Sequence, residues 1–161
     1  DDAESKGAEV VLDGRGLVVE GYEKGHFLGP TIVDNVSLDS ELYKQEVFGP
    51  VLAIVHADTY EEAIELLNSS PFGNGAAIFT NDGGVARRFE LEAEAGMVGI
   101  NVPIPTPVAY YSFGGWKESL LGDTHIHGPE GVKFYTRAKA ITTRWPSEKK
   151  YAATMSFQRE E

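Results

Sequence analysis

The segment Glu46-Val47-Phe48-Gly49-Pro50 carries residues suited to binding a ligand. Its glycine and proline force a sharp reversal, which can present Glu46 and Phe48 at the end of a parallel sheet, where ligands usually bind. A carboxylate there can accept hydrogen bonds from sugar hydroxyls, and an aromatic ring can pack on a flat heterocycle. Composition alone favours the alternative, a surface turn with a solvated glutamate and a core phenylalanine.

A second candidate site lies between residues 101 and 115. Asn101 follows an apolar run, and its amide could hold the following loop through hydrogen bonds to the backbone. Tyr110, Tyr111 and Phe113 offer an aromatic wall, which suits a small substrate with an apolar part. Ordinary packing of a long loop is an equally good explanation.

Metal and thiol chemistry find little support in the sequence. His125 and His127 are spaced to point the same way in an extended segment, but no cluster of acidic residues or cysteines accompanies them, so two surface histidines are expected and no metal site. The 161 residues include no cysteine, which removes disulfides, thiolate metal sites and a cysteine nucleophile from this stretch.

Composition limits the class of protein further. A hydrophobic content of 42% excludes a disordered or fibrous chain. The 14 basic against 25 acidic residues give a net charge of -11, which repels phosphate backbones, so no nucleic-acid partner is expected. No apolar run approaches the roughly 20 residues that cross a bilayer, and no membrane association is expected.

The pattern of elements predicts an α/β domain with a mostly parallel sheet and flanking helices. Thr59 and Glu62 form a capping-box pattern that begins one helix, and Asp82 is a plausible cap for a second. Residues 103–128 are rich in proline and glycine and are expected to form a long functional loop. Strands are expected near residues 8–12, 31–33, 51–57, 75–79, 97–102 and 139–144, and helices near 40–44, 60–68, 85–95 and 129–135.

The Glu46-Val47-Phe48-Gly49-Pro50 motif resembles a signature of the aldehyde dehydrogenases. The similarity covers roughly residues 5–146 and implies the C-terminal portion of their catalytic domain. It further implies that Glu46 binds the nicotinamide-side ribose of NAD and that Phe48 contacts the nicotinamide region. Other matching motifs follow in order along the chain: Gly29-Pro30-Thr31-Ile32, Gly75-Ala76-Ala77-Ile78-Phe79-Thr80, Gly99-Ile100-Asn101, Phe113-Gly114-Gly115-Trp116-Lys117-Glu118-Ser119 and Phe134-Tyr135-Thr136.

The long loop is similar to that of the methylmalonate-semialdehyde dehydrogenases, through Asn101-Val102-Pro103-Ile104-Pro105 and Gly122-Asp123-Thr124. Most other aldehyde dehydrogenases carry glycine where Leu120 stands. The resemblance implies NAD as cofactor, coenzyme A as co-substrate, and oxidation of methylmalonate or malonate semialdehyde to propionyl-CoA or acetyl-CoA. It also implies that Phe113 lines the aldehyde pocket.

The family's chemistry needs a cysteine thiolate that attacks the aldehyde and forms a thioester, because a thiolate is both a strong nucleophile and a good leaving group. In the family this cysteine lies upstream of the Glu46 motif, by more residues than precede Glu46 in this sequence. We therefore expect a fragment with no catalytic residue of its own, inactive alone, and lacking the NAD-binding domain.

The end of the sequence resembles the strand that extends a neighbouring subunit's sheet in aldehyde dehydrogenases. The expected organisation is a partial catalytic domain over residues 1–137, an oligomerisation strand over 138–146 and a polar tail over 147–161. A homo-oligomer, dimer or tetramer, is expected, in the cytoplasm of a bacterium or the mitochondrial matrix of a eukaryote. Two alternatives remain: a non-catalytic oligomerisation module, and an aldehyde dehydrogenase with another substrate and hydrolytic deacylation.

Overall fold

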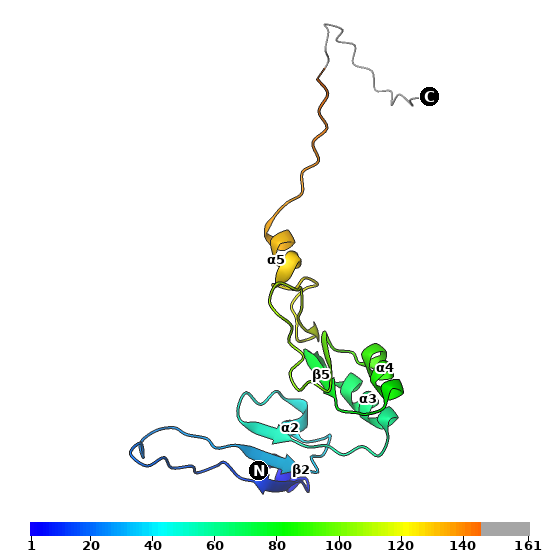
Figure 1. The fold of residues 1–161 in the computed structure, drawn as a ribbon. Coiled ribbons are helices and arrows are strands. Elements are labelled where there is room, and N and C mark those ends of the chain that lie inside the picture. The colour runs from blue at the N-terminus through cyan, green and yellow to red at the C-terminus, as the bar shows by residue number, and fades with distance from the viewer. Residues whose placement is uncertain (146–161) are drawn as a thin grey trace.

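The computed structural model describes residues 1–145, which form short strands and helices in mixed order (Figure 1). Among these residues, no helix combines the length and the apolar character needed to cross a membrane. The strands are β1 Glu9–Leu12, β2 Thr31–Asp34, β3 Val51–Ala53, β4 Phe72–Gly73, β5 Gly75–Ile78, β6 Met97–Ile100 and β7 Trp116–Lys117. The helices are α1 Asp2–Ser5, α2 Glu41–Lys44, α3 Tyr60–Ser69, α4 Gly83–Glu92 and α5 Gly128–Tyr135.

The described strands form three small sheets, whereas the sequence predicted one mostly parallel sheet. β2 lies between β1, which is antiparallel to it, and β3, which is parallel. β5 pairs with β6 in parallel, and β4 pairs with β7 antiparallel. The α/β class is therefore right, but the single sheet is wrong for this chain, because apolar patterns identify strands without identifying their partners.

β3 corrects a second expectation, that residues 51–57 form a buried parallel strand. The strand ends at Ala53 and pairs on one side only, with β2. Leu52 is 56% exposed. An apolar run predicts a strand that can be buried, but burial also requires other segments to cover it. No segment among the described residues covers Leu52.

The N-terminal sheet packs on α1 and α2. Ala3, Val33 and Val36 form its buried core, and partly buried apolar side chains surround them. Ser40, the N-cap of α2, is completely buried and bonds Asp2 of α1. These contacts fix the start of α2, and with it the chain that leaves α2 toward β3.

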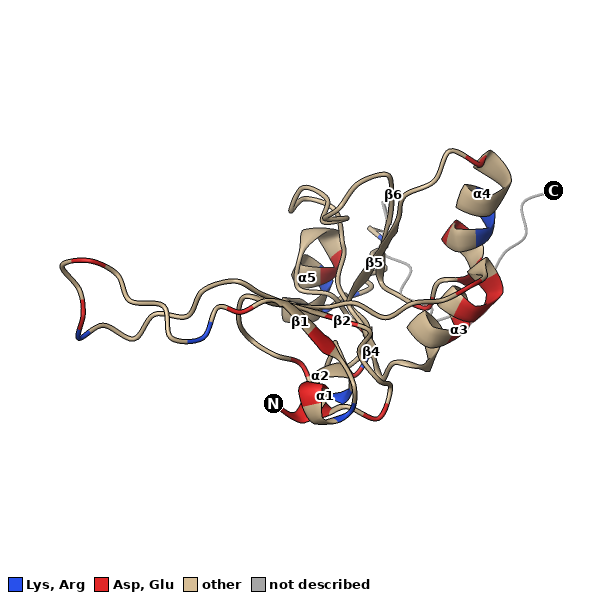
Figure 2. Cartoon of the chain, turned by 90° about the horizontal axis from the view of Figure 1, so that it is seen from below, with Lys and Arg blue, Asp and Glu red and all other residues tan. Residues whose placement is uncertain are grey.

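The two longer helices have the predicted N-caps, although α4 begins and ends two to three residues before the expected range 85–95. The Thr59 hydroxyl accepts a hydrogen bond from the Glu62 N–H at 3.2 Å, and one carboxylate oxygen of Asp82 accepts from two N–H groups at the start of α4. The Glu62 carboxylate accepts from the Asp58 N–H instead of from Thr59. In a capping box the Glu62 carboxylate would accept from the N–H of the N-cap residue itself, so here this bond is made one residue earlier in the chain. α3 carries several acidic residues, which are coloured red in Figure 2.

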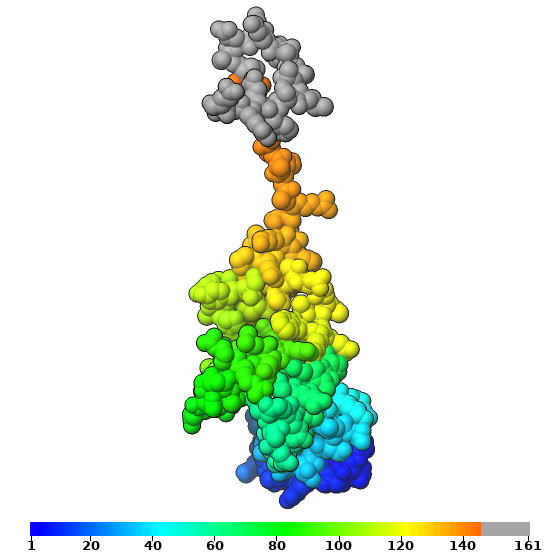
Figure 3. Space-filling view, turned by 90° about the vertical axis from the view of Figure 1, so that its right-hand side faces the viewer, coloured from blue at the N-terminus to red at the C-terminus, as the bar shows by residue number. Residues whose placement is uncertain are grey.

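The segment 103–128 was expected to be a loop throughout, but it contains β7. α5 then forms near the predicted position and lies away from the N-terminal sheet, and the described chain extends further beyond it (Figures 1 and 3). Residues 138–145 form no strand in this chain. Residue 146 and the predicted tail, 147–161, lie outside the described residues, and pairing with another subunit stays a prediction.

Candidate functional site

Glu46 and Phe48 lie in an extended segment between α2 and β3. The segment bends at Gly49 and Pro50 before the chain enters β3, and the Pro50 carbonyl accepts a hydrogen bond from the Thr31 N–H of β2 at 2.8 Å. This bond anchors the bend to the sheet. Phe48 is 98% exposed, so the alternative of a core phenylalanine is wrong.

Glu46 lies at a pocket of about 380 Å³ in the N-terminal region. Among the described residues, no side chain bonds the Glu46 carboxylate, so both of its oxygens are free to accept hydrogen bonds. The pocket wall is mainly apolar, with polar groups around it. The residues lining it are Asp1, Asp2, Ala3, Glu4, Val10, Arg15, Leu28, Thr31, Val33, Glu41, Leu42, Gln45, Glu46, Val47 and Val51.

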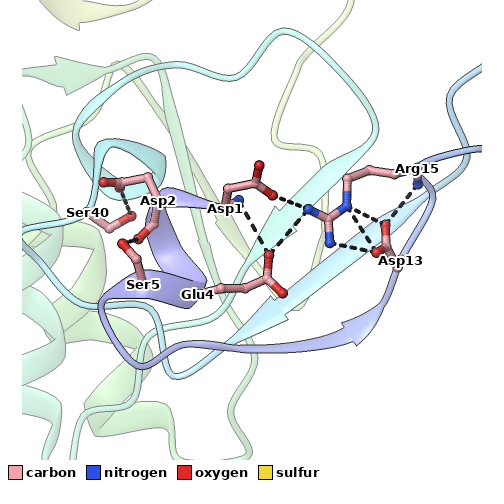
Figure 4. Close-up of polar contacts among 7 residues, drawn as sticks. All are labelled: Asp1, Asp2, Glu4, Ser5, Asp13, Arg15 and Ser40. Carbon is pink, nitrogen blue, oxygen red and sulfur yellow. Dashed lines mark hydrogen bonds and ion pairs between the residues drawn. The ribbon is translucent and has the colours of Figure 1, made fainter.

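Arg15 is among the residues that line this pocket, and ion pairs hold its side chain (Figure 4). It pairs with both carboxylate oxygens of Asp13, at 2.7 to 3.0 Å, and with Glu4 and Asp1. These hydrogen bonds lower the pKa of Asp13 to about 2. The sequence did not single out Arg15, because its acidic partners come from two separate segments.

Asp2 connects α1 to the start of α2. Its carboxylate accepts hydrogen bonds from the Ser40 hydroxyl at 3.0 Å and the Glu41 N–H at 2.8 Å, and it pairs with Lys6 at 2.9 Å. The bond from Lys6, followed by that from Glu41, lowers the pKa of Asp2 to about 2. This carboxylate therefore helps to hold the helix that leads to Glu46.

Phe113 lies in a different region, against the start of α5. Its ring stacks on the ring of His127, with centroids 4.5 Å apart and planes 8° from parallel. His125 is also half-buried, and its Nδ1 is 3.2 Å from the Glu130 carboxylate. The expectation of two surface histidines is wrong, because the fold brings the loop before β7 against the residues that precede α5.

Lys117 connects the ends of α3 and α4, a contact that sequence analysis did not predict. Its ammonium donates to the carbonyls of Asn68 and Ser70, at 2.6 and 3.1 Å, and pairs with Glu94 at 2.8 Å. The Ser119 hydroxyl accepts from the Gly73 N–H at 3.1 Å. The motif from Phe113 to Ser119 therefore contains a structural brace, whose partners could not be read from its own residues.

Asn101 holds the neighbouring strand's end and not the loop that follows it. Its amide accepts a hydrogen bond from the Thr80 N–H at 2.8 Å and donates to the Thr80 carbonyl at 3.0 Å. Its backbone has a φ of 57°, which asparagine tolerates better than most residues. The Asn101 amide therefore bonds backbone groups, as predicted, but these belong to Thr80 and not to the loop that follows Asn101.

The described chain does not unite the candidate residues in one cavity. Glu46 and Phe48 share the bend before β3, whereas Phe113 is not among the residues lining the Glu46 pocket. Within residues 1–145, no group of three or more histidines and carboxylates is placed to hold a metal ion. With no cysteine in the sequence, this geometry can bind and position but does not supply a nucleophile of the thiolate type.

The family model described as "Aldehyde dehydrogenase family" matches residues 1–141. The chain belongs to the aldehyde dehydrogenase family. A methylmalonate-semialdehyde dehydrogenase of Sinorhizobium meliloti, described as putative and crystallised with NAD, has a similar structure: the TM-score is 0.87 and the identity 52%, covering 92% of this chain and 30% of that one.

The similar curated proteins include semialdehyde dehydrogenases from bacteria and mitochondria. A malonate-semialdehyde dehydrogenase of Pseudomonas aeruginosa is 54% identical over 154 residues, covering 96% of this chain and 31% of that protein. The mitochondrial acylating methylmalonate-semialdehyde dehydrogenase of Arabidopsis thaliana is 52% identical over 139 residues, covering 86% and 23%. The chain thus spans less than a third of these relatives' length.

Proposed function

We propose that this chain is part of the catalytic domain of an NAD-dependent, CoA-acylating methylmalonate- or malonate-semialdehyde dehydrogenase. The observation that carries the proposal is the 54% identity, across nearly the whole chain, to a malonate-semialdehyde dehydrogenase. The acylating reaction is named for the Arabidopsis relative, and NAD is bound in the Sinorhizobium structure. The products proposed are propionyl-CoA and acetyl-CoA.

Glu46 is proposed to accept hydrogen bonds from the hydroxyls of the nicotinamide-side ribose. Its carboxylate is exposed beside a pocket and has no side-chain partner among the described residues. That state fits a carboxylate reserved for a ligand, because a paired carboxylate would have to break a bond first. When bound, NAD would accept the hydride. Glu46 contributes by orienting the ribose.

The two phenylalanines are proposed to serve different parts of the same active site. Phe48 is exposed, and its ring can pack on the flat nicotinamide. Phe113 is proposed to line the aldehyde pocket. The two rings meet at one site only if the remainder of the enzyme completes the cleft between them. The nucleophilic cysteine must also come from outside this sequence, which has none.

Replacing Glu46 by glutamine in the intact dehydrogenase tests this proposal. Loss of a hydrogen bond to a charged group should raise the KM for NAD by roughly tenfold or more. Glu65→Gln is the matched control, because Glu65 is an exposed residue of α3 and should leave the KM unchanged. An unaltered KM for NAD in the Glu46 variant would remove Glu46 from the cofactor site.

The acylating step needs its own measurement. The intact enzyme should turn methylmalonate semialdehyde over faster with coenzyme A than without it and yield an acyl-CoA. The isolated chain should produce no NADH under either condition. Equal turnover without coenzyme A, with a free acid as product, would favour the alternative of hydrolytic deacylation on another aldehyde.

A non-catalytic oligomerisation module is the second candidate function. The one-sided pairing of β3 favours it, because an uncovered strand edge can add a strand from another chain. The intact protein distinguishes the two: NADH production from a semialdehyde supports the enzyme, whereas a stable oligomer that binds no NAD and produces no NADH supports the module. The compartment is proposed to be bacterial cytoplasm or mitochondrial matrix, in line with the bacterial and mitochondrial relatives.

A further inference from the structure

The start of α5 is docked closely on the loop that carries Phe113. The Gly128 N–H donates to the Ala109 carbonyl at 3.2 Å, and the Glu130 N–H donates to the Ser112 hydroxyl at 3.2 Å. Two N–H groups at the first turn of this helix are thus satisfied by the loop. The loop cannot move away without leaving both groups unpaired.

The approach is too close for larger residues. A Cβ added to Gly128, whose φ is 65°, would lie 2.5 Å from the Ser112 nitrogen. A Cβ added to Gly114 would lie 2.5 Å from the His125 ring. The lack of a side chain at Gly114 and at Gly128 therefore allows close contact at the residues directly before and after Phe113.

His127 occupies the N-cap position of α5 but does not cap it. A residue at this position commonly accepts a hydrogen bond from the helix with its side chain, whereas His127 makes no such bond. Its ring lies flat on the ring of Phe113 instead, with the centroids 4.5 Å apart. The side chain's principal contact is therefore the phenylalanine proposed to line the aldehyde pocket.

We propose that His127 is a positioning residue, which fixes the plane of the Phe113 ring and thereby the shape of the aldehyde pocket. The inference rests on the proposed function, because Phe113 must face the aldehyde. His127 does not touch the substrate. It restricts rotation of the Phe113 ring from the side away from the pocket, which sets how well a short semialdehyde is held.

Three variants of the intact dehydrogenase test this role. His127→Phe keeps a flat ring for stacking, whereas His127→Leu and His127→Ala remove it. The two variants without a ring should raise the KM for methylmalonate semialdehyde roughly three- to tenfold, the range expected for loss of an aromatic pair, with kcat and the KM for NAD unchanged. His127→Phe should restore the KM for the semialdehyde. His26→Ala is the control, because His26 is exposed in the connection between β1 and β2.

A double variant separates positioning from general destabilisation. In a Phe113→Leu background, His127→Leu should have no further effect on the semialdehyde KM, because the ring on which it acts is already gone. Additive effects, or an unchanged KM in both ring-less variants, would overturn the positioning role. Parallel losses of kcat and thermal stability without a KM change would overturn it as well.

The same measurements distinguish this inference from the proposed function. If the wild-type intact enzyme does not oxidise the semialdehyde with NAD, the proposed function fails and the inference fails with it. If the wild type is active and the His127 variants behave like wild type, only the inference fails.

Discussion

The N-terminal region, from α1 to β3, and the region from α3 to β7 are held together in different ways. In the first, ion pairs of Arg15 join α1 to the turn after β1, hydrogen bonds to Asp2 join α1 to the start of α2, and β3 pairs on one side only. In the second, single side chains reach across to backbone groups of distant segments, as Lys117 and Asn101 do. Ion pairs between exposed side chains contribute little to the free energy of unfolding. Hydrogen bonds from partly buried side chains to backbone groups contribute more. The first region therefore depends more on charged side chains between its segments, and the second on hydrogen bonds from side chains to backbone groups.

The largest effect expected from this comparison is at Lys117. Lys117→Met removes the donor to two carbonyls and the partner of Glu94, from a side chain only 23% exposed. The free energy of unfolding should fall by about 3 kcal/mol, as for loss of hydrogen bonds to a charged group. Urea denaturation measures the change, with the exposed Lys133→Met as control. A loss no greater than in the control would contradict the brace.

Asn101 should show the next largest effect. Asn101→Ala removes both hydrogen bonds to Thr80 and strains a backbone with positive φ, which together should cost about 2 kcal/mol. Asn101→Gly loses the bonds but relieves the strain and should cost less. Urea denaturation of the two variants separates the contributions. Equal losses would show that the positive φ stores no strain.

Acid should loosen the contacts of α1 and α2 in the N-terminal region. The pKa of Asp2 and that of Asp13 are lowered from 3.8 to about 2, so their stabilising contribution is present above about pH 4 and is lost as the pH falls toward 2. Protection against hydrogen exchange, measured between pH 5 and 2 relative to the unfolded chain, should fall in α1 and α2. Asp2→Asn should reduce this dependence on pH. Unchanged protection of α1 and α2 down to pH 2 would contradict this role of the two carboxylates.

The smallest effect is expected in the open strand. Leu52→Thr should change the free energy of unfolding by no more than about 0.5 kcal/mol, because Leu52 is 56% exposed and its strand has one neighbour. The same substitution should reduce self-association in sedimentation velocity experiments. A loss well above that value would show that Leu52 is covered in solution.

Local features were the most predictable part of the fold. Thr59 and Asp82 were recognised as helix caps because a capping bond spans only two or three residues. β5, β6 and α5 were expected close to their observed positions because apolar runs, glycines and prolines mark them. β4 and β7 were missed, since two-residue strands have no period and are defined only by each other.

The candidate site was predictable only as a set of residues. Motif similarity selected Glu46, Phe48 and Phe113, and the structure adds that Glu46 lies at a pocket and Phe48 in solvent. Their binding roles stay predictions. The stacking of His127 on Phe113 had no sequence signal, because a separation of 14 positions across an irregular loop carries no periodicity.

The sequence by itself determined the family, the α/β class and the helix starts, because motifs, apolar periods and caps are encoded in neighbouring residues. Only the tertiary structure decided that Lys117 braces the ends of two helices, that Asn101 holds Thr80, and that β3 remains open. Each of these depends on which distant backbone groups come within about 3 Å, the reach of a hydrogen bond. That proximity is a property of the packed chain and not of any one segment.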